Sequence, residues 1–315
     1  MWTVFWWGLF AIPSALSVNF QFFCRNDGSP ALVAVATVIS TVLNIFLNWL
    51  FVFPMQMGIM GAAIATGISQ TVSWLVVAMH FILHKDDLRI RPYKPQMGMF
   101  GQIIFFGLPE MIAQFATPVT TICLNTVIVA HLGEVGVNAF AVISYVASLA
   151  ISVFAGAAEG LQPLFGQTYG AKEEKDMKSY FRSGMLISFV GSIVIVGLCI
   201  FFGRPICSLF GADAETLEYT LYYLPQYAWA FVVVGLNTMI SAYLYSTERS
   251  GYAIPLNICR ALAFNTLIIR GLPALVGESI IWYTYGIAEG AVLVLAVILL
   301  KISERNSIVF KEPQY

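Results

Sequence analysis

The chain contains nine long apolar segments, and each has enough residues to cross a lipid bilayer as a helix. A transmembrane helix needs about 20 apolar residues, whereas a transmembrane strand needs only about 10. No segment alternates apolar and polar residues with the period of two that a strand requires. The expected spans cover residues 2–24, 30–53, 61–83, 98–131, 138–165, 180–203, 218–246, 253–276 and 279–301. The sequence therefore predicts an all-α integral membrane protein.

The composition supports a membrane protein and excludes several functions. Hydrophobic residues make up 59% of the chain, charged residues make up 10%, and the mean hydropathy is +0.80. Soluble domains carry about 25% charged residues. A net charge of −1 gives no reason to expect nucleic acid as a partner. The sequence has no nucleophile motif, phosphate-binding loop or cluster of metal ligands, so neither an enzyme nor a cofactor is expected.

The basic residues indicate which ends of the spans face the cytoplasm. Thirteen Lys and Arg residues lie in the tail or in the connections after odd-numbered spans, and two lie at the opposite ends. Positive charge gathers on the cytoplasmic side, so the C-terminus is expected in the cytoplasm and the first residue outside. The thirteen are Arg25, Lys85, Arg89, Arg91, Lys94, Lys172, Lys175, Lys178, Arg182, Arg249, Lys301, Arg305 and Lys311, and the two are Arg204 and Arg270.

The last three spans repeat the first three at a distance of 223 residues. At this shift Arg25–Gly28 falls on Glu248–Gly251, and Ile64–Gly67 falls on Ile287–Gly290. The three spans between the repeats have no upstream partner, which predicts a protein of six plus six helices without its first three. The expected parts are a partial N-terminal lobe over 1–84, a cytoplasmic linker over 85–97, a C-terminal lobe over 98–301 and a cytoplasmic tail over 302–315.

A row of polar residues follows one face of the second span. Thr37, Thr41, Asn44 and Asn48 are spaced four, three and four residues apart, which places them on one side of a helix. Amides in hydrocarbon are costly unless they meet a partner. This face is therefore expected to point at a bundle interior or a wet cavity, as a channel or carrier requires.

The fourth span carries a second polar row with a carboxylate in it. A carboxylate at membrane depth costs about 2.5–3.5 kcal/mol on insertion scales unless it pairs or neutralises. Glu110 could attract a cationic substrate or take up a proton, and the alternative is a seam of hydrogen bonds between helices. The row comprises Glu110, Gln114, Thr117, Thr121 and Asn125.

Other polar residues in the spans each allow two interpretations. Glu159 and Gln162 either line a substrate path or form a pair at the membrane surface. Glu289 either functions directly or forms a structural ion pair with Arg260. His80 and His84 are expected at the interface rather than in a metal site, because the sequence shows no carboxylate or cysteine nearby. A further face that could line a cavity carries Asn237, Ser241 and Tyr245.

Four stretches of the chain resemble the multidrug and toxic compound extrusion (MATE) family, most closely its bacterial branch. They are Arg25–Pro30 (RNDGSP), Gly61–Thr66 (GAAIAT), Gly107–Pro109 (GLP) and Gln162–Ala171 (QPLFGQTYGA). The resemblance implies two six-helix lobes around a central cavity. This chain would then be a MATE-like bundle of about nine transmembrane helices, with three helices of the first lobe and all six of the second.

The resemblance also implies a cation site in the first lobe. Residues of this site in the family fall on Asn44, Asn48 and Thr66, and the coupling ion is H⁺ or Na⁺. The family usually has an Asp where this chain has Asn48, and another Asp lies on the first helix, which is absent here. An amide can ligate Na⁺ through its carbonyl group but cannot carry a proton.

The function implied is a secondary active multidrug exporter. It would exchange lipophilic organic cations for H⁺ or Na⁺ by alternating access, in the plasma membrane, as a monomer without a cofactor. One alternative is a lipid-linked oligosaccharide flippase of the same superfamily, which a cavity rich in Arg and Lys would favour. The other is a truncated remnant that does not transport. The residues expected to contact substrate are Glu110, Gln114, Asn125, Glu159, Gln162 and Asn237.

Overall fold

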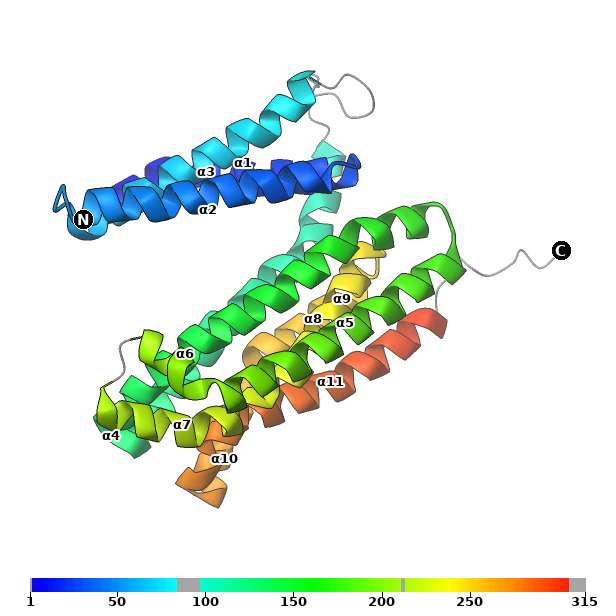
Figure 1. Ribbon diagram of the computed structural model, residues 1–315. Coiled ribbons are helices and arrows are strands. Elements are labelled where there is room, and N and C mark those ends of the chain that lie inside the picture. The colour runs from blue at the N-terminus through cyan, green and yellow to red at the C-terminus, as the bar shows by residue number, and fades with distance from the viewer. Residues whose placement is uncertain (1, 84–96, 211–212, 306–315) are drawn as a thin grey trace. The chain divides into compact units, whose positions relative to one another are not determined.

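A computed structural model of the protein describes residues 2–83, 97–210 and 213–305 (Figure 1). Every regular element within these ranges is a helix, which confirms the predicted all-α membrane fold. The chain divides into two compact units, residues 1–95 and 96–315, here called unit 1 and unit 2. The linker predicted over 85–97 and most of the tail over 302–315 lie outside the described residues.

Unit 1 consists of three long helices. They are α1 (Trp2–Asn26), α2 (Pro30–Val52) and α3 (Gly58–Leu83). Helix α3 packs along both α1 and α2. The tight turn between α1 and α2 contains Gly28 at φ 76°, a left-handed conformation that glycine adopts without strain, and Pro30 then begins α2.

Unit 2 begins with α4 (Met97–Gly170), which contains two of the predicted spans. The two halves are helical up to a single break at Gly133, where φ is 64° and ψ is −156°. A connection over residues 132–137 was expected, but one glycine reverses the chain without a loop. Only glycine adopts these angles readily, which explains why the break falls at this residue.

The other elements of unit 2 follow the predicted spans, with two interruptions. The span predicted over 218–246 bends by 42° at Trp229, a few residues after Pro225 removes a backbone donor. The span predicted over 253–276 contains a π-helical turn. In chain order these elements are α5 (Glu174–Phe201), α6 (Gly203–Leu209), α7 (Ala214–Ala228), α8 (Ala230–Ser246), α9 (Ser250–Ile258), η1 (Cys259–Phe264), α10 (Asn265–Val276), η2 (Glu278–Ile280) and α11 (Ile281–Arg305).

Six helices of the described chain are long and apolar enough to cross a membrane, and the bent pair α7 and α8 makes a seventh. Helix α4 is 74 residues long and bends back at Gly133, so its two halves represent two spans. Helix α1 has 25 residues, a length similar to those of α2 and α3. The structure therefore has the helical rods that the sequence predicts.

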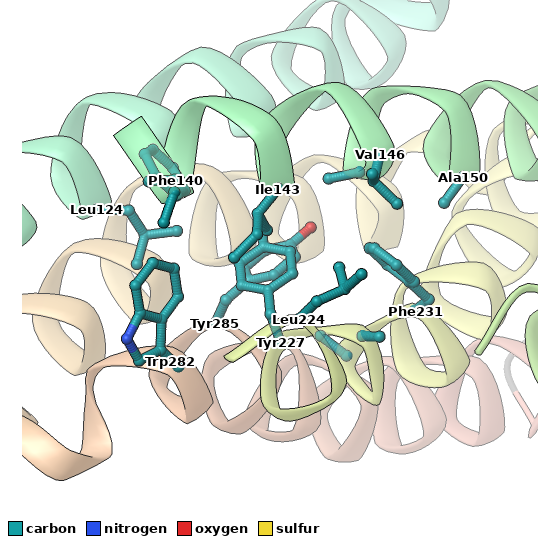
Figure 2. Close-up of a cluster of buried hydrophobic side chains, with 14 of the residues drawn as sticks. Leu124, Phe140, Ile143, Val146, Ala150, Leu224, Tyr227, Phe231, Trp282 and Tyr285 are labelled. Atoms are coloured by element: carbon teal, nitrogen blue, oxygen red, sulfur yellow. The ribbon is translucent and has the colours of Figure 1, made fainter. Parts of the chain in front are cut away.

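The core of unit 2 is rich in aromatic residues (Figure 2). Figure 2 shows Phe140 and Ile143 of α4 above Leu224, Tyr227 and Trp282 of α7 and α11, all of which are buried. Aromatic rings bury a large area each, and offset or edge contacts between them add stability. This cluster holds the second half of α4 against α7 and α11.

The helix boundaries preserve the internal repeat. Helix α3 begins at Gly58 and α11 at Ile281, which are 223 residues apart. Helices α1 and α3 pack together in unit 1, as their counterparts α8 and α11 do in unit 2. In each unit, a residue in the turn after the first helix forms a hydrogen bond with the third helix. Asp27 bonds to His80 in unit 1, and Arg249 donates to Ser303 in unit 2. His80 and Ser303 are 223 residues apart, so they occupy the same repeat position. The structure thus supports a repeat that few sequence identities revealed.

Candidate functional site: a charged cavity in unit 2

A cavity of about 110 Å³ lies inside unit 2, between the two halves of α4 and the elements α8, η1 and α11. Small residues such as Ala113, Ala155 and Ala158 leave this space between the helices. Polar and charged side chains project into it from four elements that are far apart in sequence. The main ones are Glu110, Gln114, Glu159, Gln162, Arg260 and Glu289.

One part of the cavity wall is acidic. Glu110 accepts a hydrogen bond of 2.8 Å from Nε2 of Gln114, one helical turn along α4. Gln162 on the other half of α4 donates to the hydroxyl group of Tyr245 at 3.1 Å, and Glu159 borders the same space. Glu110 and Tyr245 also interact directly. These residues present carboxylate, amide and phenol oxygens to a cationic ligand.

A buried ion pair forms another part of the wall. Nε of Arg260 lies 2.9 Å from Oε1 of Glu289, and only 1% of the Glu289 side chain is exposed. The amide of Asn237 donates to the other carboxylate oxygen at 2.8 Å and to the Glu289 carbonyl oxygen at 2.9 Å. Tyr285 hydrogen-bonds to Arg260 and stacks on Tyr227, with ring centroids 5.3 Å apart. The structural ion pair proposed from the sequence is therefore present, and it borders the cavity.

Two asparagines join the helices around the cavity. Asn257 of α9 donates to the Pro109 carbonyl oxygen of α4 at 2.8 Å and accepts from Ser241 of α8 at 3.1 Å. Asn265 donates to Oγ1 of Thr120 at 2.6 Å. Both asparagines are fully buried, and buried polar groups of this kind stabilise a structure only when they are hydrogen-bonded.

The structure separates the six residues expected to contact substrate into two groups. Glu110, Gln114, Glu159 and Gln162 line the cavity. Asn237 lies behind the wall, where it holds Glu289. Asn125 lines neither this cavity nor a smaller hollow of about 40 Å³ further along α4, and its side chain is exposed. The polar row of the fourth span therefore continues past the cavity.

The three residues expected to bind a cation in unit 1 lie together. Nδ2 of Asn44 is 3.3 Å from Oγ1 of Thr66 on α3, and Nδ2 of Asn48 is 3.1 Å from Oδ1 of Asn44. All three side chains are half-buried. The rest of the row differs, because Thr37 and Thr41 are exposed and donate to carbonyl oxygens of their own helix.

His80 has a partner that the sequence did not predict. Its Nε2 atom, on α3, lies 2.9 Å from Oδ2 of Asp27, which lies in the turn between α1 and α2. The two residues are therefore distant in sequence but in contact in the fold. The expectation that no carboxylate lies near His80 was therefore wrong. His84 lies outside the described residues. Among those that are described, no cluster of three or more His, Cys, Asp or Glu side chains could hold a metal ion.

Sequence reasoning found most of the polar residues in the cavity wall but missed Tyr285. Ser241 and Tyr245 line the cavity, as the face that they share on α8 suggested. Tyr285 was not predicted, although it precedes Glu289 by four residues and so lies on the same face of α11. No spacing in the sequence indicated the roles of Asn257 and Asn265. Their partners on α4 are more than 140 residues away in the sequence. Asn257 also bonds to Ser241, which is 16 residues away on α8.

Comparisons with known proteins connect this arrangement to one family. Residues 109–269, just over half of the chain, match the family model described as MatE. The multidrug export protein MepA of Staphylococcus aureus (strain MSSA476) is 23% identical over 282 residues, which cover 88% of this chain and 61% of the relative. MepA of Staphylococcus saprophyticus is 23% identical over 269 residues, 82% of this chain and 58% of the relative.

Solved structures of the same kind share the fold. A mutant of the Vibrio cholerae MATE transporter VcmN superimposes with a TM-score of 0.87 at 20% identity, over 97% of this chain and 70% of that chain. A crystal structure of MATE in complex with MaL6 gives a TM-score of 0.84 at 22% identity, over 94% and 67%. The chain thus spans about 60% of the length of the curated relatives that it matches.

Proposed function

Because the chain belongs to the MatE family of membrane transporters, we propose that it binds lipophilic organic cations for export from the cell. Membership of a transporter family agrees with the expectation from the sequence that the chain is not an enzyme. The proposed transport is antiport against H⁺ or Na⁺ by alternating access between two lobes. The proposed location is the plasma membrane, with the C-terminus in the cytoplasm because the basic residues gather on that side.

The acidic wall of the cavity is the observation that carries this proposal. The wall has three carboxylates, Glu110, Glu159 and Glu289, and one guanidinium group, which Glu289 neutralises. Carboxylates therefore outnumber basic groups among the described residues that line the cavity. Negative charge in a space of low dielectric constant attracts a cation strongly.

The same balance of charge argues against the flippase alternative. A lipid-linked oligosaccharide carries a pyrophosphate, so its transporter needs unpaired Arg or Lys residues in the cavity. The only basic residue among those that line this cavity is Arg260, and it is paired with Glu289. Organic cations therefore suit this cavity better than phosphorylated lipids.

The proposed site for the coupling ion is the group Asn44, Asn48 and Thr66 in unit 1. Amide and hydroxyl oxygens are ligands for hard cations, whereas none of these side chains can carry a proton. Their mutual hydrogen bonds hold the three side chains close together. Of the two ions considered for the family, these residues favour Na⁺.

Binding of ethidium to the purified chain tests the substrate proposal directly. Glu110→Gln removes one negative charge from the cavity wall and is expected to weaken binding by about tenfold. Glu134→Gln makes the same change on an exposed part of α4 outside the cavity and serves as the matched control. Fluorescence anisotropy measures both. Equal affinity of the Glu110→Gln and wild-type proteins would remove Glu110 from the site.

Ion titrations test the proposal for unit 1. Na⁺ is expected to raise the melting temperature of the wild-type chain more than K⁺ at equal ionic strength. Asn48→Ala should abolish this difference. Asn19→Ala is the matched control, because Asn19 is exposed on α1 and also donates to a carbonyl oxygen of its own helix, at 2.8 Å. A Na⁺ effect that survives in Asn48→Ala would exclude this residue as a ligand.

A further inference from the structure

Glu289 of the buried ion pair in unit 2 occupies the repeat position of Thr66, one of the three residues of the proposed cation site in unit 1. At the shift of 223 residues, Thr66 corresponds to Glu289 and the exposed Thr37 corresponds to Arg260. Unit 1 therefore has two hydroxyl groups where unit 2 has a carboxylate and a guanidinium group. One unit offers only uncharged oxygens at this place, whereas the other supplies both an anion and a cation from its own chain.

The surroundings of Glu289 are those of a site that holds a cation. One carboxylate oxygen faces Arg260 at 2.9 Å, the other accepts from Asn237 at 2.8 Å, and Tyr285 hydrogen-bonds to the guanidinium group. The Glu289 side chain is 1% exposed, so its charge requires a counter-ion. The side chain of Arg260 fills that role, and both residues border the cavity.

The backbone at Arg260 departs from α-helical geometry. Residues Cys259–Phe264 form the π-helical turn η1 between α9 and α10. A π-helical turn rotates the residues that follow it about the helix axis, and such turns are frequent at functional sites. The irregular turn thus coincides with the residue that supplies the cation.

We propose that Glu289, Asn237 and Tyr285 form a second cation site, specific for the guanidinium type, whose resident occupant is the side chain of Arg260. In the native chain this occupant cancels the charge of Glu289. The attraction of the cavity for an organic cation then depends on its other acidic residues, such as Glu110. This consequence rests on the proposed function, whereas the existence of the site does not.

Chemical rescue tests the site itself. Arg260→Ala is expected to lower the melting temperature of the chain, and millimolar guanidinium chloride should raise it again by a few degrees. Equal concentrations of sodium chloride and tetramethylammonium chloride control for ionic strength and for cation size. The wild-type protein and Arg260→Ala/Glu289→Gln should show no such rise. A folded Arg260→Ala protein that does not respond to guanidinium would overturn the proposal.

Two further variants decide the question if Arg260→Ala does not fold. Glu289→Gln leaves the Arg260 charge uncompensated beside the cavity, so ethidium binding should weaken by about tenfold. Arg260→Met/Glu289→Gln removes both charges at similar volume, and binding should return to within about threefold of wild type. Equal affinities of these two variants would overturn the proposal. If the wild-type protein bound no ethidium, the proposed function would fail, and the guanidinium response would still decide whether the site exists.

Discussion

Units 1 and 2 contain related helices but stabilise their polar residues in different ways. Unit 1 holds Asn44 and Thr66 by hydrogen bonds between uncharged, half-buried groups. Unit 2 holds Glu289 and Arg260 as an ion pair that is almost wholly buried. A buried pair needs helices around it that exclude water and complete its hydrogen bonds, and unit 2 has them.

The largest expected effect comes from breaking the ion pair on one side. Glu289→Ala leaves a buried guanidinium group unpaired and should destabilise unit 2 by about 3–5 kcal/mol. Thr66→Ala, the change at the same repeat position in unit 1, removes the hydrogen bonds that the hydroxyl group makes with Asn44 and with the Ala62 carbonyl oxygen, and should cost about 1–2 kcal/mol. Unfolding in mixed detergent and dodecyl sulfate micelles measures both. Similar losses would show that the two units do not differ in this respect.

Close packing of glycine against an aromatic ring provides the next comparison. A Cβ atom added at Gly286 would lie 2.2 Å from the ring of Trp229, and one at Gly67 would lie 2.1 Å from the ring of Phe10. Alanine at either position should cost about 2–3 kcal/mol, because a rigid ring must move. Gly290→Ala is the matched control on α11, where nothing lies within 4 Å. A neutral Gly286→Ala variant would contradict the packing at the bend between α7 and α8.

A smaller effect is expected from the hydrogen bonds that join helices of unit 2 to α4. Asn257→Ala leaves the Pro109 carbonyl oxygen and the Ser241 hydroxyl group without this partner, and should cost about 1–2 kcal/mol. The same unfolding measurement applies. Asn125→Ala, an exposed amide on α4, should change stability little and is the control. Equal stability of both variants would mean that Asn257 does not fasten α9 to α4.

The smallest effect concerns the connection before α7, outside the membrane spans. Hydrogen bonds from the Thr216 side chain and backbone hold the pKa of the Asp213 carboxyl group below its usual range. A lowered pKa in the folded state means that the charged form stabilises the fold at neutral pH. This contribution is lost as the pH falls from about 4 through the folded pKa. Melting temperatures of Asp213→Asn should therefore depend less on pH below about 4 than those of wild type. Parallel pH profiles would contradict this role.

The predictable part of the fold was the set of helices, since span length depends on local composition. All nine predicted spans pair with helices of the described chain that start or end within a few residues of the prediction, and α4 supplies two of them. The details of the helices that the sequence did not predict depend on the backbone geometry at single residues. The reversal at Gly133 needed no loop, Trp229 marks a bend, and α9 continues into a π-helical turn at Cys259. A hydropathy pattern contains no information on such angles.

The candidate site was predictable only where its residues share a helix face. Glu110 and Gln114, or Ser241 and Tyr245, stand one turn apart, so spacing alone placed each pair on one side of a helix. The Asp27 partner of His80 was missed, because the two residues are 53 positions apart. Contacts of that kind depend on how helices pack, and one sequence does not specify which face meets which.

The sequence by itself determined that this chain is a bundle of membrane helices with a repeated three-helix pattern, because both properties follow from the order of apolar and polar residues. It also determined that the chain contains carboxylates and amides whose burial requires partners. Only the tertiary structure decided that Glu289 meets Arg260 and Asn237 while Glu110 and Glu159 face a cavity. Hydrophobic burial acts without direction, whereas an ion pair or a hydrogen bond forms only when packing brings two particular groups within about 3 Å.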